Sequence, residues 1–177
     1  MQRSIVSMVI LLTGASHTGK TLCAQRLLEN YRFPYLSLDH LKMGIIRSGY
    51  TDLTVYDDDK LTSYLWPVVC GIIKTAVENK QNLIVEGCYV PPDWADSFEQ
   101  PYLRDIRYVC LIMTDGYIDK HYNSILSHAS DIEQRLDDSG CSKEYLIQEN
   151  QRYLEECKRY GNAYILIESE YRVDITL

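Results

Sequence analysis

One stretch constrains this chain more than any other, the run Gly14-Ala15-Ser16-His17-Thr18-Gly19-Lys20-Thr21 with the spacing G-x-x-x-x-G-K-[ST]. Glycine at these positions lets successive backbone N–H groups curl around a phosphate without a Cβ atom in the way. Lys20 is then expected to reach the β- and γ-phosphates of a nucleotide, and Thr21 to offer its hydroxyl to Mg²⁺. The motif therefore predicts a nucleotide-binding loop over residues 14–21.

The flanks of the motif supply the strand and the helix that such a loop requires. Residues 5–12 form a nearly continuous apolar run, which is typical of a strand buried on both faces. Residues that favour helix follow Thr21, so the N-terminus of a helix would face the bound anion. The alternative is a chance match within a glycine turn, and the two flanks argue against it.

Strands and helices are expected to alternate along the rest of the chain. The predicted strands are 34–38, 82–87, 107–113 and 163–167, with helical segments over 60–80, 114–138 and 142–160 and a further edge strand at 171–177. Such alternation indicates crossover units, and hence an α/β fold with a parallel sheet covered by helices on both faces. A length of 177 residues without a linker predicts one domain over residues 1–177.

Composition limits the partners of the chain. A net charge of -7 argues against a nucleic-acid or anionic membrane surface, because those partners select clustered Lys and Arg. No apolar run approaches the length of a membrane span. The six cysteines are scattered without a C-x-x-C pair, and we interpret them as small core residues in a reducing cytosol. We therefore expect a cytoplasmic protein with small-molecule partners, and the oligomeric state stays open.

Two carboxylates follow predicted strands of the sheet. Asp39 comes after strand 34–38 and Glu86 lies at the end of strand 82–87. Ligands of open parallel sheets bind at the carboxyl ends of the strands, where the loop 14–21 also lies. Asp39 is therefore a candidate base or holder of a magnesium-bound water, and Glu86 a candidate contact to Mg²⁺ through water or to the acceptor. Their structural alternatives are an N-cap for a helix beginning near residue 40 and a carboxylate bonded to backbone N–H groups.

Basic residues that would hold the substrates are few. Lys42 and Arg47 lie in the region of about 40–60, where a phosphoryl acceptor would enter, although each alone is more often a surface charge. The region of about 114–143 resembles a mobile lid, in which an arginine can neutralise charge that develops on a transferring phosphoryl group. Arg135 is the first candidate, with Lys120 and Arg152 next. The alternative for Arg135 is a pair with an aspartate on its own helix.

Three pieces of the sequence resemble the P-loop small-molecule kinases, the group that includes adenylate, shikimate and gluconate kinases and zeta toxins. These pieces are the loop 14–21, Leu36-Ser37-Leu38-Asp39-His40, and Ile84-Val85-Glu86-Gly87 followed by Pro91, the last being similar to 2-phosphoglycerate-kinase-like sequences. The resemblance implies a five-stranded parallel sheet in the order 2-3-1-4-5, ATP with Mg²⁺, Asp39 as base and an arginine-bearing lid. Lys120 is the nearest counterpart of the arginine that stacks on adenine in many relatives.

The leading functional hypothesis is a kinase that transfers the γ-phosphoryl group of Mg-ATP to a small metabolite. One alternative is a nucleotide-binding switch or slow ATPase without a small-molecule acceptor, which the arginine-poor lid favours. A second alternative is a zeta-toxin-like kinase of a nucleotide sugar.

Overall fold

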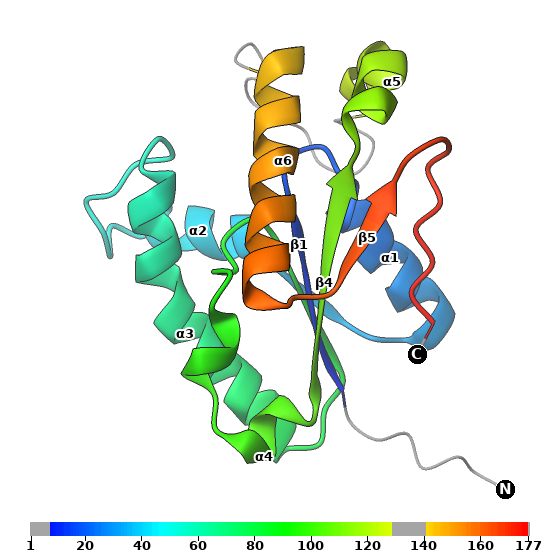
Figure 1. Cartoon of the computed structure of the whole chain (residues 1–177). Helices are drawn as coiled ribbons and strands as arrows, with labels where there is room; N and C mark the ends of the chain where they lie inside the picture. The colour runs from blue at the N-terminus through cyan, green and yellow to red at the C-terminus, as the bar shows by residue number, and fades with distance from the viewer. Residues whose placement is uncertain (1–7, 129–140, 177) are drawn as a thin grey trace, which may run out of the picture.

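The structure, a computed structural model, describes residues 8–128 and 141–176 (Figure 1). Its centre is a five-stranded parallel sheet in the order β2-β3-β1-β4-β5. The strands are β1 (Val9–Gly14), β2 (Tyr35–Ser37), β3 (Leu83–Glu86), β4 (Ile106–Met113) and β5 (Tyr164–Ile167). The predicted alternation, parallel pairing and strand order are confirmed.

Helices connect the strands, and local signals in the sequence set several of their ends. The helices are α1 (Lys20–Tyr31), α2 (Leu38–Arg47), α3 (Asp58–Glu78), the 3₁₀ turn η1 (Trp94–Ser97), α4 (Gln100–Leu103), α5 (Asp115–Ser127) and α6 (Lys143–Tyr160). The Ser142 hydroxyl accepts a hydrogen bond from the Tyr145 N–H at 3.1 Å, so it caps α6 as its sequence position predicts. Gly161, with φ of 68°, ends the same helix in the left-handed conformation.

Two hydrophobic clusters cover the two faces of the sheet. Alternate residues of β1 divide between them, because successive side chains of a strand point to opposite faces. Val9 and Leu11 pack with α2 and α3, whereas Ile10 and Leu12 pack with α1, α5 and the C-terminal tail. Helix α6 contributes side chains to both clusters. The carboxyl ends of the strands lie toward the top of Figure 1, and the loop after β1 and the helices α1, α2 and α5, which follow β1, β2 and β4, begin at this edge of the sheet.

Three details differ from the sequence-based expectations. Strand β1 begins at Val9 and continues to Gly14, whereas residues 5–7 lie outside the described part of the chain. Helix α2 begins at Leu38 and takes Ser37 as its N-cap residue, so Asp39 lies in the first turn of the helix and does not cap it. Residues 171–176 add no strand to the sheet. In the described part of the chain, no helix has the length and apolar character needed to cross a membrane.

Candidate active site

The loop from Gly14 to Lys20 joins the end of the central strand β1 to the start of α1. The Thr18 hydroxyl donates to the Ala15 carbonyl at 2.9 Å, and Lys20 Nζ donates to the same carbonyl at 2.8 Å. Lys20 is buried, with 7% of its surface exposed. A buried ammonium group and the positive end of the α1 dipole therefore lie together at this loop, a combination that favours a bound anion.

Glu86 brings a carboxylate to the first residues of α1. It is the last residue of β3, which lies beside β1, and only 1% of its surface is exposed. The Thr21 hydroxyl donates to Glu86 Oε2 at 3.4 Å. A hydroxyl and a carboxylate oxygen are hard donors of the kind that Mg²⁺ prefers, so this pair fits a magnesium ion that takes its other ligands from phosphate and water. Within residues 8–128 and 141–176, no group of three or more His, Cys, Asp or Glu side chains could hold a metal ion.

Asp39 follows β2, the strand that pairs with the strand of Glu86. Ser37, the last residue of β2, pairs in register with Glu86, and Asp39 follows two residues later in the first turn of α2. Leu38 lies against Gly87, where a Cβ atom would come within 2.8 Å of Leu38 Cβ. The φ of 149° at Gly87 separately disfavours any residue with a side chain. The close fit of these two residues sets where α2 begins and hence where Asp39 stands.

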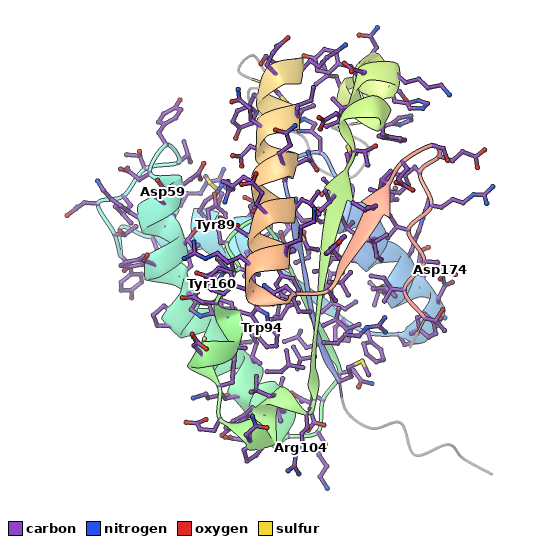
Figure 2. All side chains as sticks on the ribbon, viewed as in Figure 1. Asp59, Tyr89, Trp94, Arg104, Tyr160 and Asp174 are labelled. Carbon is purple, nitrogen blue, oxygen red and sulfur yellow. The ribbon has the colours of Figure 1, made fainter. Side chains whose placement is uncertain are left out.

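Asp39 is the first member of a polar chain that we call the acceptor-side network, formed by Asp39, Lys42, Tyr89 and Asp58. Asp39 Oδ1 and Lys42 Nζ form an ion pair at 2.8 Å. Lys42 Nζ also donates to the Tyr89 hydroxyl at 2.8 Å, and that hydroxyl donates to Asp58 Oδ1 at 2.7 Å. Figure 2 places Tyr89 between α3 and α6. The network thus links α2, the segment after β3 and the N-terminus of α3 through side chains alone.

The network combines buried and exposed groups. Tyr89 is buried and the Lys42 side chain is 13% exposed, whereas the Asp39 side chain is 42% exposed. Burial raises the pKa of the Tyr89 phenol, and its hydrogen bond to Asp58 raises that pKa further. The phenol therefore stays neutral and donates its proton to the carboxylate. The two carboxylates at the ends of the network, Asp39 and the exposed Asp58, are its accessible groups, and Asp39 is the one that follows a strand at the carboxyl edge of the sheet.

The remaining basic candidates do not converge on this network in the described part of the chain. Arg47 is exposed in the last turn of α2, and Lys120 is exposed on α5. Arg152 bonds two glutamates of its own helix, Glu149 at 2.8 and 3.1 Å and Glu156 at 3.0 Å. Those contacts, with the Glu149 bonds foremost, raise the pKa of Arg152.

The region predicted to form a lid is described only in part. Helix α5 fills its first half, and residues 129–140, including Arg135, lie outside the described residues. Cys141 lies beside the phosphate-binding loop, with its Sγ 3.6 Å from His17 Nδ1. The Tyr122 hydroxyl of α5 donates to the Cys141 carbonyl at 2.8 Å. Cys141 is half-buried at this position and packs against the edge of the hydrophobic cluster that includes α1, so it is only partly the core residue that was expected.

Comparisons with known proteins add the name of the fold. No family model matches the sequence, and no curated protein does. Shikimate kinase from Bacteroides thetaiotaomicron superposes with a TM-score of 0.55 and 17% identity, covering 92% of this chain and 86% of that one. A candidate kinase from Chloroflexus aurantiacus j-10-fl superposes with a TM-score of 0.53 and 17% identity, covering 96% of this chain and 92% of that one. The chain has the P-loop small-molecule kinase fold. At this identity the likeness establishes the fold, and activity must be argued from the site.

Within this P-loop kinase fold, sequence reasoning missed three residues that the structure brings to the site. Asp58 lies in the run Asp57-Asp58-Asp59, which by itself indicates only a solvated loop or helix start, although Asp58 begins α3 and accepts from Tyr89. Tyr89, three residues after the strand-end Glu86, could have been suspected from its place at the carboxyl edge. Tyr171 contacts the P-loop from the far end of the chain, and no local pattern signals that contact.

Proposed function

We propose that this chain is a kinase that transfers the γ-phosphoryl group of Mg-ATP to a hydroxyl or acid group of a small metabolite. The observation that supports it is the meeting of two different polar sites at one sheet edge in a kinase fold. One site is a loop with the features of a phosphate cradle, and the other is a network that ends in the accessible carboxylate of Asp39. A site for nucleotide alone would not need the second.

Each residue then has a chemical role. Backbone N–H groups of residues 14–21 bind the phosphates, and Lys20 neutralises charge on the β- and γ-phosphates. Thr21 and Glu86 are the residues that would hold Mg²⁺, Glu86 through a water molecule, and the ion when bound would screen phosphate charge. Lys42 orients Asp39. Arg47, Lys120 and Arg135 keep the roles that their places in the sequence suggest, which are contacts to the acceptor, to the base of the nucleotide and to the transferring phosphoryl group.

The transfer step needs one base and one leaving group. The Asp39 carboxylate takes the proton of an acceptor hydroxyl as the hydroxyl oxygen forms a bond to the γ-phosphorus. The bond between that phosphorus and the β–γ bridging oxygen breaks, and ADP leaves with the electron pair. Lys42, 2.8 Å from Asp39 Oδ1, keeps the carboxylate aimed from one side while leaving its other oxygen for the acceptor.

The proposal is tested by ADP release from Mg-ATP across a panel of sugars, sugar phosphates, nucleosides and hydroxy acids. We expect at least one acceptor to raise turnover well above the rate with water alone, and the phosphorylated product to appear in equal amount by mass spectrometry. Nucleotide binding without stimulation by any acceptor would overturn the kinase proposal.

One observation favours a second candidate, a nucleotide-binding switch or slow ATPase. Arg152, the lid-side arginine that the structure describes, is engaged by Glu149 and Glu156 and so does not extend toward the loop. A switch would bind nucleotide tightly and hydrolyse it at the same slow rate whether or not acceptors are present. The panel above separates the two candidates.

A further inference from the structure

The C-terminal tail packs along α1 after leaving β5 (Figure 1). Ile175 is buried in the hydrophobic cluster that includes residues of α1, and Arg107 Nη1 donates to the Thr176 carbonyl at 2.7 Å. In Figure 2, Asp174 marks the tail where it passes this helix. The tail is therefore anchored at its far end, which gives its nearer residues a defined position against α1.

Tyr171 carries the contact between this tail and the P-loop. Its hydroxyl lies 3.1 Å from the Thr18 carbonyl oxygen and 3.2 Å from the Gly19 carbonyl oxygen, so its one proton is shared between two acceptors. Burial raises the pKa of the Tyr171 phenol, which therefore remains a donor throughout the physiological pH range. The Gly19 carbonyl also accepts from the Cys23 N–H at 2.9 Å, a bond in the first turn of α1.

The position of these two carbonyls fixes two N–H groups. A peptide unit is planar and trans, so its N–H points opposite to its C=O. The carbonyls of Thr18 and Gly19 belong to the same peptide units as the N–H groups of Gly19 and Lys20. Holding both carbonyls on the side of Tyr171 therefore turns both N–H groups to the opposite side, away from the tail.

Gly19 and Tyr171 also fit each other sterically. Gly19 has φ of 78°, and a Cβ atom built on it would overlap the Tyr171 hydroxyl. The hydroxyl can reach the backbone at this point only because residue 19 lacks a side chain. The second glycine of the motif thus serves both the turn of the loop and the approach of the tail.

We propose that Tyr171 is a positioning residue of the nucleotide site, whose hydroxyl presets the N–H groups of Gly19 and Lys20 for phosphate. This inference rests on the proposed function, because it needs a nucleotide in the P-loop. It makes the tail part of the nucleotide site, although the tail is about 150 residues from the motif in sequence.

The test compares Tyr171→Phe with the matched control Tyr102→Phe. Each variant loses one phenol hydroxyl. Tyr102 lies on α4, next to the start of β4 and so at the end of the sheet away from the P-loop, and its hydroxyl donates to Glu78 Oε1 at 2.6 Å. Dissociation constants for Mg-ATP and Mg-ADP are measured by calorimetry, at a temperature where circular dichroism shows all proteins folded. We expect Tyr171→Phe to weaken both nucleotides roughly three- to tenfold, as for one lost hydrogen bond, and Tyr102→Phe to leave both unchanged.

The outcomes separate this inference from the proposed function. Nucleotide affinity of Tyr171→Phe within twofold of the wild type overturns the positioning role, even if the variant melts at a lower temperature. Equal weakening in Tyr102→Phe also overturns it, since the effect would then be one of general stability. A wild-type protein that binds neither nucleotide overturns the proposed function itself.

Discussion

The nucleotide side and the acceptor side of this site are built from different parts of the chain. On the nucleotide side, residues 14–21 are adjacent in sequence, and the Thr18 hydroxyl and the Lys20 ammonium group both donate to the main-chain carbonyl of Ala15. On the acceptor side, four side chains spread over residues 39–89 meet through bonds between their polar ends. A local spacing specifies the loop of the first, to which Glu86 and Tyr171 add distant contacts, whereas the whole of the second exists only once the sheet has formed.

The difference also concerns tolerance to change. Every residue type except proline supplies a backbone N–H group, so the nucleotide side depends chiefly on its glycines and on Lys20. Each member of the acceptor-side network is a particular side chain, and neighbours lose a partner when one is replaced. Damage on the nucleotide side should therefore weaken nucleotide binding, and damage on the acceptor side should change turnover while nucleotide still binds.

Lys20→Ala should have the largest effect, because it removes the buried ammonium group expected at the β- and γ-phosphates. We expect Mg-ATP affinity and turnover to fall on the order of 10²-fold or more, measured by calorimetry and ADP release. Lys74→Ala is the control, since Lys74 is paired with Glu99 at 3.5 Å and lies away from the loop on α3. Unchanged ATP affinity in Lys20→Ala would contradict the nucleotide side as a whole.

Asp39→Asn should separate the two sides. The amide keeps the size of the side chain but is no base, so we expect turnover to fall about 10²- to 10⁴-fold while Mg-ATP affinity stays within about threefold. Asp59→Asn, an exposed position in the first turn of α3, is the matched control and should be neutral. If Asp39→Asn keeps full turnover with the acceptor found in the panel, another group is the base.

This contrast explains which parts of the molecule could be predicted from sequence. The parallel sheet and the loop were predictable from local signals such as the apolar run of β1 and the glycine spacing after it. The strand order was predictable only from the resemblance to P-loop kinases. Glu86 and Asp39 were predictable as strand-end residues, although α2 begins two residues earlier than expected. The bond from Tyr89 to Asp58 was not predictable, because it depends on how α3 packs beside the segment after β3.

Gly87→Ala should disturb the acceptor side through the backbone. Residue 87 has φ of 149°, and the added methyl would press on Leu38 at the start of α2, so we expect a loss of about 1–3 kcal/mol in the free energy of unfolding. Gly116→Ala is the matched control, because that glycine lies in the first turn of α5 with open space around it, so the variant should be at least as stable as the wild type. Both free energies of unfolding come from urea denaturation, and equal stability of the two variants would show that α2 does not depend on this contact.

Tyr89→Phe should have the smallest effect and tests whether the network acts as a unit. The substitution keeps the buried ring but removes the hydroxyl between Lys42 and Asp58, leaving the Asp39–Lys42 ion pair intact. We expect KM for the acceptor to rise roughly three- to tenfold, with Mg-ATP affinity unchanged. A double-mutant cycle with Lys42→Met measures the coupling, which should be about 0.5–3 kcal/mol for residues in one hydrogen-bonded network. Additive effects would mean that Tyr89 supports the fold here and that Lys42 alone aims Asp39.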